Sequence, residues 1–163
     1  PGSGVNLPYY PAGIRWIGVE PNVHMHAHIR KKAAALDLEI DVRDDSATAL
    51  PLADASVDAV VSTLVLCSVP DLPEALAEIR RVLKPGGRFV FIEHIAAPPG
   101  TWLRRVQRGI RPLWRLMADG CCPDRATHLA LNAAGFTDVR YEHFEIDAPL
   151  PIVKPHIIGT ARK

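Results

Sequence analysis

This chain of 163 residues has few cysteines, a small net charge and no long apolar run. Its three cysteines, two of them adjacent, are too few for a disulfide framework and favour a reducing setting. The chain has nineteen basic and eighteen acidic side chains and a net charge of +1, so its electrostatic attraction for nucleic acid is weak. No apolar run approaches the roughly 20 residues that a membrane-spanning helix requires. These absences predict a cytoplasmic protein without a nucleic-acid partner.

What is present is the composition of a folded domain: 48% hydrophobic and 23% charged residues, with a mean hydropathy of +0.05. The length suits one domain with a single core. Repeats, low-complexity tracts and linkers are absent, so we predict one domain over residues 1–163. The opening Pro1-Gly2-Ser3-Gly4 is unlike a natural start, and we expect this domain to be incomplete at its N-terminus.

Strands and helices are predicted to alternate along most of the chain. Alternation with short connections indicates βαβ units and an α/β fold with a mostly parallel sheet. Two later strands, at 139–146 and 153–161, follow each other across a Pro-rich loop and should pair antiparallel. The earlier strands are expected at 14–19, 39–42, 58–63 and 88–93, with helices at 23–36 and after Asp71.

Two of these elements carry specific expectations. Residues 58–63 form a β-branched run, typical of a strand buried on both faces of a parallel sheet. Asp71 and Glu74 form a capping-box pattern at the start of the following helix. Lys84-Pro85-Gly86-Gly87 should end that helix.

The segment 102–117 has an apolar and a basic face, both at three- and four-residue spacing. Pro112 should kink or break the helix near Arg111. Three interpretations stay open: a solvated surface helix, a cover over a substrate pocket, or a peripheral contact with an anionic membrane surface. The apolar set is Leu103, Val106, Ile110, Leu113 and Met117, and the basic set is Arg104, Arg108, Arg111 and Arg115.

Glycines form a turn near the start, and an acid follows at the end of the next predicted strand. Gly2 and Gly4 would let a ligand approach the backbone, and Glu20 would accept the two hydroxyls of a ribose. A dinucleotide fingerprint requires a third glycine where this chain has Leu7. S-adenosylmethionine, which has a ribose but no pyrophosphate, fits the pattern better than a nicotinamide or a flavin.

Two further segments are expected at the same edge of the sheet. Asp45-Ser46-Ala47 follows the second predicted strand, and Thr63-Leu64 ends the third. In open α/β sheets the ligand crevice lies at the carboxyl ends of the strands. Both segments should therefore border the ligand.

In order and spacing, these motifs resemble class I S-adenosylmethionine-dependent methyltransferases, and the likeness covers nearly the whole chain. The matching motifs are Gly2-Ser3-Gly4, Glu20-Pro21-Asn22, Leu50-Pro51 with Asp54 and Asp58, and Leu83-Lys84-Pro85-Gly86-Gly87. Smaller markers are similar to the thiol S-methyltransferase group of the methyltransferase-like proteins and its bacterial relatives. These markers are residues 63–69, Glu93-His94, Thr101-Trp102, Asp119-Gly120-Cys121 and Lys154-Pro155-His156-Ile157.

The resemblance implies a Rossmann-like sheet of seven strands, the sixth and seventh forming an antiparallel edge pair. The family pattern starts with an apolar strand just before Pro1, so we expect the first strand to be absent from this chain. Its loss would expose unpaired backbone of its neighbours in the sheet. Implied cofactor contacts are Gly2, Gly4, Glu20, Ser46, Ala47 and Thr63, and Asn6, Pro21, Asp45 and Leu64 beside them complete the predicted set.

Methyl transfer from a sulfonium needs an acceptor held in line and, for a thiol, help in losing a proton. His94, at a predicted strand end, is the first candidate for that base, and His156 is the second. Cys67 is interpreted as a small apolar filler.

No metal site is predicted. Of His24, His26 and His28, only the first and last share a helix face, and that pair is interpreted as a solvated surface. The adjacent Cys121 and Cys122 lack the two intervening residues of a metal pair and are interpreted as reduced thiols.

Three functions stay open. The leading one is methylation of a small hydrophobic acceptor, above all a thiol. The second is N-, O- or C-methylation of a lipid or another small molecule. The third is a non-catalytic domain that keeps the cofactor fold and binds a partner. The sequence does not indicate the oligomeric state.

Overall fold

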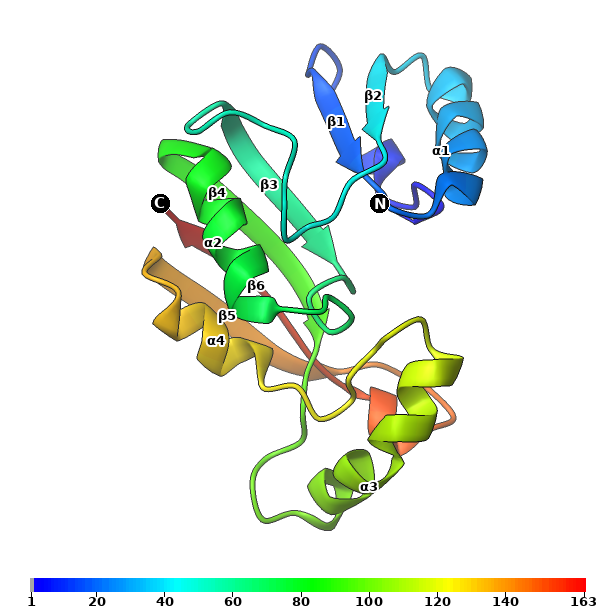
Figure 1. Ribbon diagram of the computed structural model, residues 1–163, viewed down its shortest axis with the longest axis vertical. Helices are drawn as coiled ribbons and strands as arrows, with labels where there is room; N and C mark the ends of the chain where they lie inside the picture. Colours follow the sequence, from blue (N-terminus) through cyan, green and yellow to red (C-terminus); the bar gives the residue numbers. More distant parts are fainter. Residues whose placement is uncertain (1) are drawn as a thin grey trace. The chain divides into compact units, whose positions relative to one another are not determined.

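The computed structural model describes residues 2–163 (Figure 1). The chain forms two compact units, which divide between Pro51 and Leu52. One domain over residues 1–163 remains a prediction. No helix in the described part of the chain is both long and apolar enough to span a bilayer.

The first unit is a small βαβ arrangement. Its two strands pair in parallel, with Trp16 opposite Ile40. The side chain of Asn22 caps the intervening helix by accepting a hydrogen bond from the amide of His24 at 3.1 Å. Leu7, Ile29 and Ala33 form its buried core. The elements are η1 (Leu7–Tyr9), β1 (Trp16–Val19), α1 (Val23–Ala35) and β2 (Ile40–Arg43).

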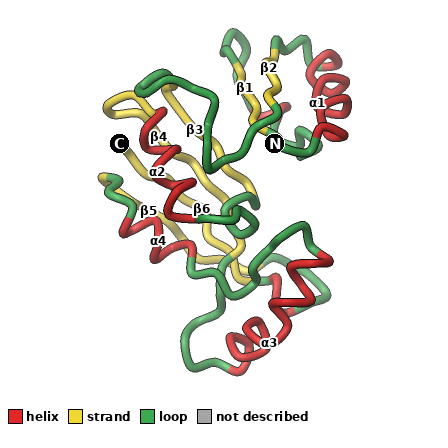
Figure 2. Tube along the Cα trace, in the orientation of Figure 1, coloured by secondary structure: helices red, strands yellow, loops and turns green. Residues whose placement is uncertain are grey.

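The second unit is a mixed sheet of four strands in the order β3-β4-β6-β5, with helices α2 and α4 over one face (Figures 1 and 2). β3 runs parallel to β4, whereas β6 is antiparallel to both β4 and β5. The antiparallel C-terminal pair predicted from sequence is therefore confirmed. The elements are β3 (Val57–Thr63), α2 (Leu72–Val82), β4 (Leu83–His94), α3 (Trp102–Met117), α4 (Thr127–Ala133), β5 (Thr137–Glu145), η2 (Pro151–Val153) and β6 (Pro155–Arg162).

Helix α2 follows the predicted pattern. The carboxylate of Asp71 accepts the amide hydrogen of Glu74 at 2.9 Å, and the helix ends at Val82, just before the expected stop. Its apolar face, which includes Leu76 and Ile79, is buried. The helix α4 is not predicted from sequence, because its seven residues make only about two turns, too few for a helical periodicity of apolar residues to be recognised.

The expectation that residues 58–63 are buried on both faces is wrong. In β3 only Ser62 is buried, and Val61 is 42% exposed. The difference follows from the position of the strand in the sheet. A β-branched run is typical of a central strand, whereas β3 is an edge strand.

Helix α3 differs from its prediction in how it attaches to the unit. It continues through Pro112 and bends along its length (Figure 2). Its buried residue is polar: the Gln107 amide accepts a hydrogen bond from the Ala97 amide at 2.8 Å and donates one to the carbonyl of Ile152 at 3.0 Å. Much of the apolar face, by contrast, is exposed, including Leu113 and Met117.

Candidate functional site

In the first unit, Glu20 and the glycine turn meet as predicted. The Glu20 carboxylate follows β1 and accepts hydrogen bonds from the amides of Gly2 at 2.8 Å and Asn22 at 3.0 Å. Partial burial raises the pKa of Glu20, whereas the hydrogen bonds from these two amides lower it, and the net shift is downward. The side chain therefore stays ionised and fixed beside the turn.

The glycines of the turn are required by its conformation. Gly2 and Gly4 have φ values of +56° and +70°, which favour glycine over any residue with a Cβ. A Cβ at Gly4 would also lie 2.9 Å from Cδ1 of Leu7, whereas a Cβ at Gly2 would have no heavy atom within 4 Å. The turn thus leaves room at Gly2 for a ligand to approach the backbone. Asn6 follows as the residue before η1.

The segment 45–47 lies at the same edge as Glu20, because β1 and β2 are parallel and the amide of Glu20 donates to the carbonyl of Arg43 at 3.0 Å. The hydroxyl of Ser46 accepts the amide hydrogen of Thr48 at 3.2 Å, which fixes this turn beside Asp45 and Ala47. The Nε2 of His26 donates to the carbonyl of Glu20 at 2.7 Å, before Pro21. His24 and His28 are exposed, as expected, but the buried His26 was not foreseen.

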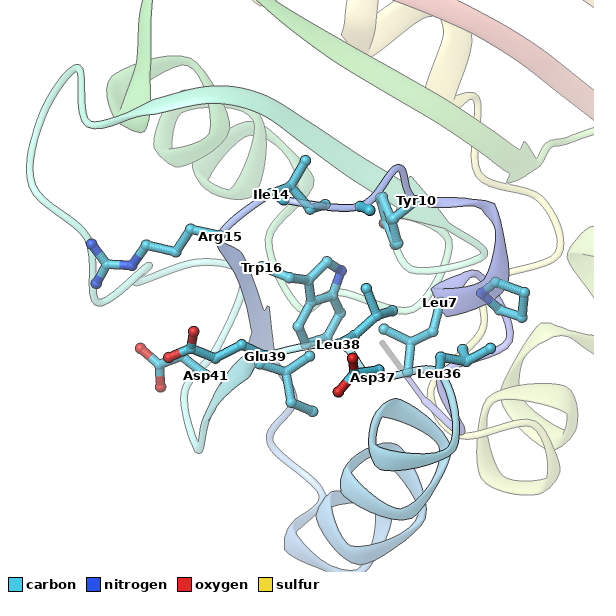
Figure 3. A pocket seen from close by; sticks show the side chains of 14 residues that line it. Leu7, Tyr10, Ile14, Arg15, Trp16, Leu36, Asp37, Leu38, Glu39 and Asp41 are labelled. Atoms are coloured by element: carbon cyan, nitrogen blue, oxygen red, sulfur yellow. The ribbon is translucent and has the colours of Figure 1, made fainter.

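A hollow of about 740 Å³ also lies on the first unit (Figure 3). Its lining includes Leu7, Tyr10, Trp16 and Leu38, around the amino ends of β1 and β2. Glu20 and the segment 45–47 lie at the opposite, carboxyl ends. The hollow is therefore a partly open part of the apolar core and not the predicted ligand site.

In the second unit, the ends of β3 and β4 are joined by a buried carboxylate. Glu93 is fully buried and accepts hydrogen bonds from the Ser62 hydroxyl at 2.5 Å and from the amides of Val65 and Leu66 at 3.2 and 3.0 Å. Burial raises the pKa of Glu93, and these donors only partly oppose the shift. Glu93 thus holds the loop that follows Thr63, in which Leu64 has a φ of +56°.

His94 and His156 lie side by side on β4 and β6, where they are register partners with ring centroids 5.5 Å apart. The Nε2 of His94 donates to the carbonyl of Ile152 at 3.0 Å, so its Nδ1 carries the lone pair. The Nδ1 of His156 donates to the carbonyl of Lys154 at 2.9 Å. Burial is the main reason that the pKa of His156 is lowered, and this keeps the ring neutral.

A cluster that was not predicted surrounds the free nitrogen of His94. The sulfur atoms of Cys67 and Cys121 and a ring nitrogen of His94 lie within 4.8 Å of one another. The hydrogen bond between the two thiols raises the pKa of Cys67 and lowers that of Cys121. Cys67 is therefore part of a polar cluster and not merely an apolar filler.

Three hydrogen bonds, donated by two residues, hold this cluster together, and neither residue was predicted to do so. The amide of Cys122 donates to the carbonyl of Cys67 at 2.8 Å, which joins the two loops. The guanidinium of Arg125 donates to the carbonyls of Leu66 and Val69 at 2.8 and 2.6 Å. An arginine in a loop gives no sequence signal for this role, since its partners lie more than 50 residues earlier.

The chain is similar to known proteins in both sequence and fold. A family model described as "Methyltransferase domain" matches residues 1–91. Human thiol S-methyltransferase TMT1A is 39% identical and human thiol S-methyltransferase TMT1B 40% identical, each over 99% of this chain and 68% of its own length. The ubiquinone/menaquinone biosynthesis C-methyltransferase UbiE of Rubrivivax gelatinosus is 41% identical over 73% of this chain and 43% of its own length.

Solved structures share the fold at low identity. The [4+2]-cyclase SpnF aligns with a TM-score of 0.77 and 21% identity, over 99% of this chain and 71% of its own. A SAM-dependent methyltransferase from Methanosarcina mazei aligns with a TM-score of 0.74 and 19% identity, over 99% and 88%. Together these two confirm the predicted Rossmann-like α/β class and, by themselves, nothing about the acceptor.

Proposed function

The chain belongs to the methyltransferase domain family and uses S-adenosylmethionine as its methyl donor, and from this premise we propose that its acceptor is a small hydrophobic thiol. The observation that carries the proposal is the match of nearly the whole chain to two thiol S-methyltransferases. The match extends beyond the cofactor motifs to the parts of the chain that contain Cys67, His94 and Cys121, and we propose that these residues serve the acceptor.

The cofactor residues fit S-adenosylmethionine. Glu20 is ionised and would accept the ribose hydroxyls, while the open space at Gly2 would admit the ligand to the turn. When bound, S-adenosylmethionine supplies an electrophilic methyl group on a positively charged sulfur. The remaining proposed contacts are Gly4, Asn6, Pro21, Asp45, Ser46, Ala47, Thr63 and Leu64.

A thiol acceptor reacts as its thiolate. His94 is placed to take the proton, because its Nε2–H is bound to Ile152 and its Nδ1 lone pair faces the cysteines. His156 is neutral beside it and is the second candidate. Glu93 is the acidic residue at these strand ends, and its carboxylate already accepts hydrogen bonds from Ser62, Val65 and Leu66. The site therefore offers little electrostatic attraction to a cationic amine.

We expect His94→Ala to lower the rate of thiol methylation about 10- to 100-fold or more, since a positioned base typically contributes about 10²–10⁴. The wild-type rate should rise between about pH 7 and 9, because the reference pKa of a thiol is near 8.5. Steady-state assays across this range would measure both effects, with the exposed His24→Ala as control. An unchanged rate in His94→Ala would remove His94 from the chemistry.

The acceptor class is tested by a product screen. Small alkyl and aryl thiols, catechols, amines and phospholipid head groups are offered side by side with S-adenosylmethionine, and methylated products are identified by mass spectrometry. Thioether products support the proposal. Turnover of nitrogen, oxygen or carbon acceptors without thiols would contradict it and leave the methyltransferase assignment intact.

We also propose that this enzyme is cytoplasmic and contacts an anionic membrane surface through α3. Leu116 and Met117 are 84% and 72% exposed, and Trp102 and Leu113 are exposed with them. Arginines lie along the adjoining face, and the helix contains no acidic residue. Exposed apolar side chains beside arginines suit the boundary of anionic lipid head groups.

Replacing Leu113, Leu116 and Met117 together by serine should weaken vesicle binding about tenfold or more, since each buried side chain contributes roughly 1.5–3 kcal/mol. Flotation with phosphatidylcholine vesicles, with and without phosphatidylserine, measures this. The control replaces Leu129, an exposed leucine of α4, by serine. Equal flotation of the triple variant and wild type, or no binding to either vesicle, would exclude a membrane role for α3.

A further inference from the structure

We propose that Cys67, His94 and Cys121 bind a zinc ion, and that the acceptor thiol occupies the remaining position on the metal. This inference rests on the proposed function, because it assigns the site where a thiol acceptor would lose its proton. It also changes the role of His94 from proton acceptor to metal ligand, because the one lone pair of Nδ1 cannot bind a proton and a metal ion at the same time. The three residues come from the loop after β3, the end of β4 and the loop after α3.

The spacing of the three ligand atoms suits a tetrahedral ion. Zinc–sulfur and zinc–nitrogen bonds of about 2.3 and 2.0 Å place two sulfurs about 3.8 Å apart and a sulfur about 3.5 Å from a nitrogen. The Cys121 sulfur lies 3.8 Å from the Nδ1 of His94, and all three atoms lie within 4.8 Å of one another. Shifts of a few tenths of an ångström to about one ångström would close the site around the ion.

His94 is already in the form that a metal ligand needs. Its Nε2–H is bound to the carbonyl of Ile152 at 3.0 Å, which selects the tautomer of the neutral ring that presents Nδ1 to the sulfurs. Histidine ligands generally donate their second ring N–H to a carbonyl or carboxylate in this way. The side chain is 4% exposed, so water does not compete with this hydrogen bond.

The two cysteines are held by backbone contacts and do not depend on the ion for their placement. The loop with Cys67 is fixed by Glu93 through its amides and by Arg125 through its carbonyls. The hydrogen bond from the Cys122 amide to the Cys67 carbonyl places Cys121 opposite. Two cysteine sulfurs, which would bind as thiolates, and one imidazole form a donor set that selects zinc over magnesium or calcium.

Three protein ligands leave one position open. In the described part of the chain the group has three members, as in catalytic zinc sites and unlike the four ligands of structural sites. An acceptor thiol would bind there as its thiolate and release its proton to solvent. Its sulfur then forms a bond to the methyl carbon while the bond between that carbon and the sulfonium breaks. The electron pair goes to the donor sulfur, leaving a thioether and S-adenosylhomocysteine.

The site is tested by metal content. The purified chain is dialysed against zinc chloride and then buffer, and bound zinc is counted by mass spectrometry. We expect one zinc per chain in wild type and in Cys122→Ala, whose sulfur lies outside the cluster, and loss in Cys67→Ala and Cys121→Ala. The loss of affinity should exceed the roughly 10- to 100-fold caused by removing an outer hydrogen-bond partner. Cobalt in place of zinc should show thiolate charge-transfer absorption that both alanine variants lack.

Circular dichroism identifies any variant that fails to fold, and Cys121→Asp, which keeps a ligand atom, should then recover part of the zinc binding. Equal zinc in wild type and the two cysteine variants would overturn the proposal. So would a wild-type chain that binds no zinc, or whose intact mass shows a Cys67–Cys121 disulfide under reducing conditions.

Activity separates this inference from the proposed function. Removal of zinc with a chelator should abolish thiol methylation, leave S-adenosylmethionine binding unchanged, and be reversed by added zinc. Full thiol turnover without zinc would overturn the metal-bound acceptor and leave the thiol proposal standing. A zinc-loaded protein that methylates other acceptors but no thiol would overturn the proposed function and, with it, the thiol position on the metal.

Discussion

Replacing Glu93 by alanine is expected to lower the free energy of unfolding by about 3–5 kcal/mol, the largest stability effect anticipated in this chain. The change removes one acceptor and leaves three donors unpaired: the buried Ser62 hydroxyl, the buried amide of Leu66 and the part-buried amide of Val65. Each unsatisfied buried donor costs about 1–3 kcal/mol. Urea denaturation followed by circular dichroism measures the loss.

The control is Glu142→Ala, an exposed glutamate on β5 of the same sheet, which should change stability by less than about 0.5 kcal/mol. The charge can be tested separately with Glu93→Gln. Burial raises the pKa of Glu93 in the folded state, so the folded protein binds a proton more tightly than the unfolded chain. Wild type therefore loses stability as pH rises above about 4.5, and its advantage over Glu93→Gln should narrow. A pH-independent difference would show that the pKa of Glu93 is not raised in the folded protein. A Glu93→Ala protein as stable as its control would show that the buried carboxylate does not hold the loop.

Replacing Glu20 by alanine should weaken S-adenosylmethionine binding by about 1.5–3 kcal/mol, or roughly 10- to 100-fold. Glu20 is fixed in the ionised form by the amides of Gly2 and Asn22. A carboxylate accepts about four hydrogen bonds, so it can hold ribose hydroxyls in addition to the amides. Titration calorimetry with S-adenosylhomocysteine and S-adenosylmethionine measures the change.

Glu39→Ala, at an exposed position just before β2, is the matched control and should bind both ligands as wild type does. Because Glu20 also holds the glycine turn, Glu20→Gln provides a second measurement: it keeps an acceptor oxygen and should lose less affinity than Glu20→Ala. Unchanged affinity in both variants would mean that the ribose does not bind at the end of β1.

Local patterns predicted the elements that depend on local physics. The cap at Asp71, the buried face of α2 and the antiparallel pair β5–β6 follow from residues close in sequence. The meeting of Glu20 with Gly2 followed from a general rule, that ligands bind at the carboxyl ends of parallel strands.

Features that depend on distant contacts were missed. Cys67 and His94 are 27 residues apart in sequence, as are His94 and Cys121. No short sequence motif therefore predicts that these three residues form a cluster. Gln107 holds α3 through partners at Ala97 and Ile152, and a helical pattern alone could not show that a glutamine would be buried while apolar residues are exposed. The β-branched pattern of residues 58–63, taken by itself, likewise does not show that β3 lies at the edge of its sheet.

Fold and chemistry separate clearly in this protein. One structure that shares its fold is a [4+2]-cyclase, so the sheet alone does not determine the reaction. The thiol acceptor is inferred instead from the match of nearly the whole chain to thiol S-methyltransferases and from the cluster of Cys67, His94 and Cys121. That cluster is also where the acceptor and the proposed metal would meet.

The most direct test of the central claim is a competition for a labelled methyl group. S-adenosylmethionine with a deuterated methyl group is mixed with the protein and equal amounts of an alkyl thiol, a catechol and an amine, and the products are resolved by mass spectrometry. The expected result is a deuterated thioether as the main product. A label found on the catechol or the amine, with the thiol unmodified, would contradict it.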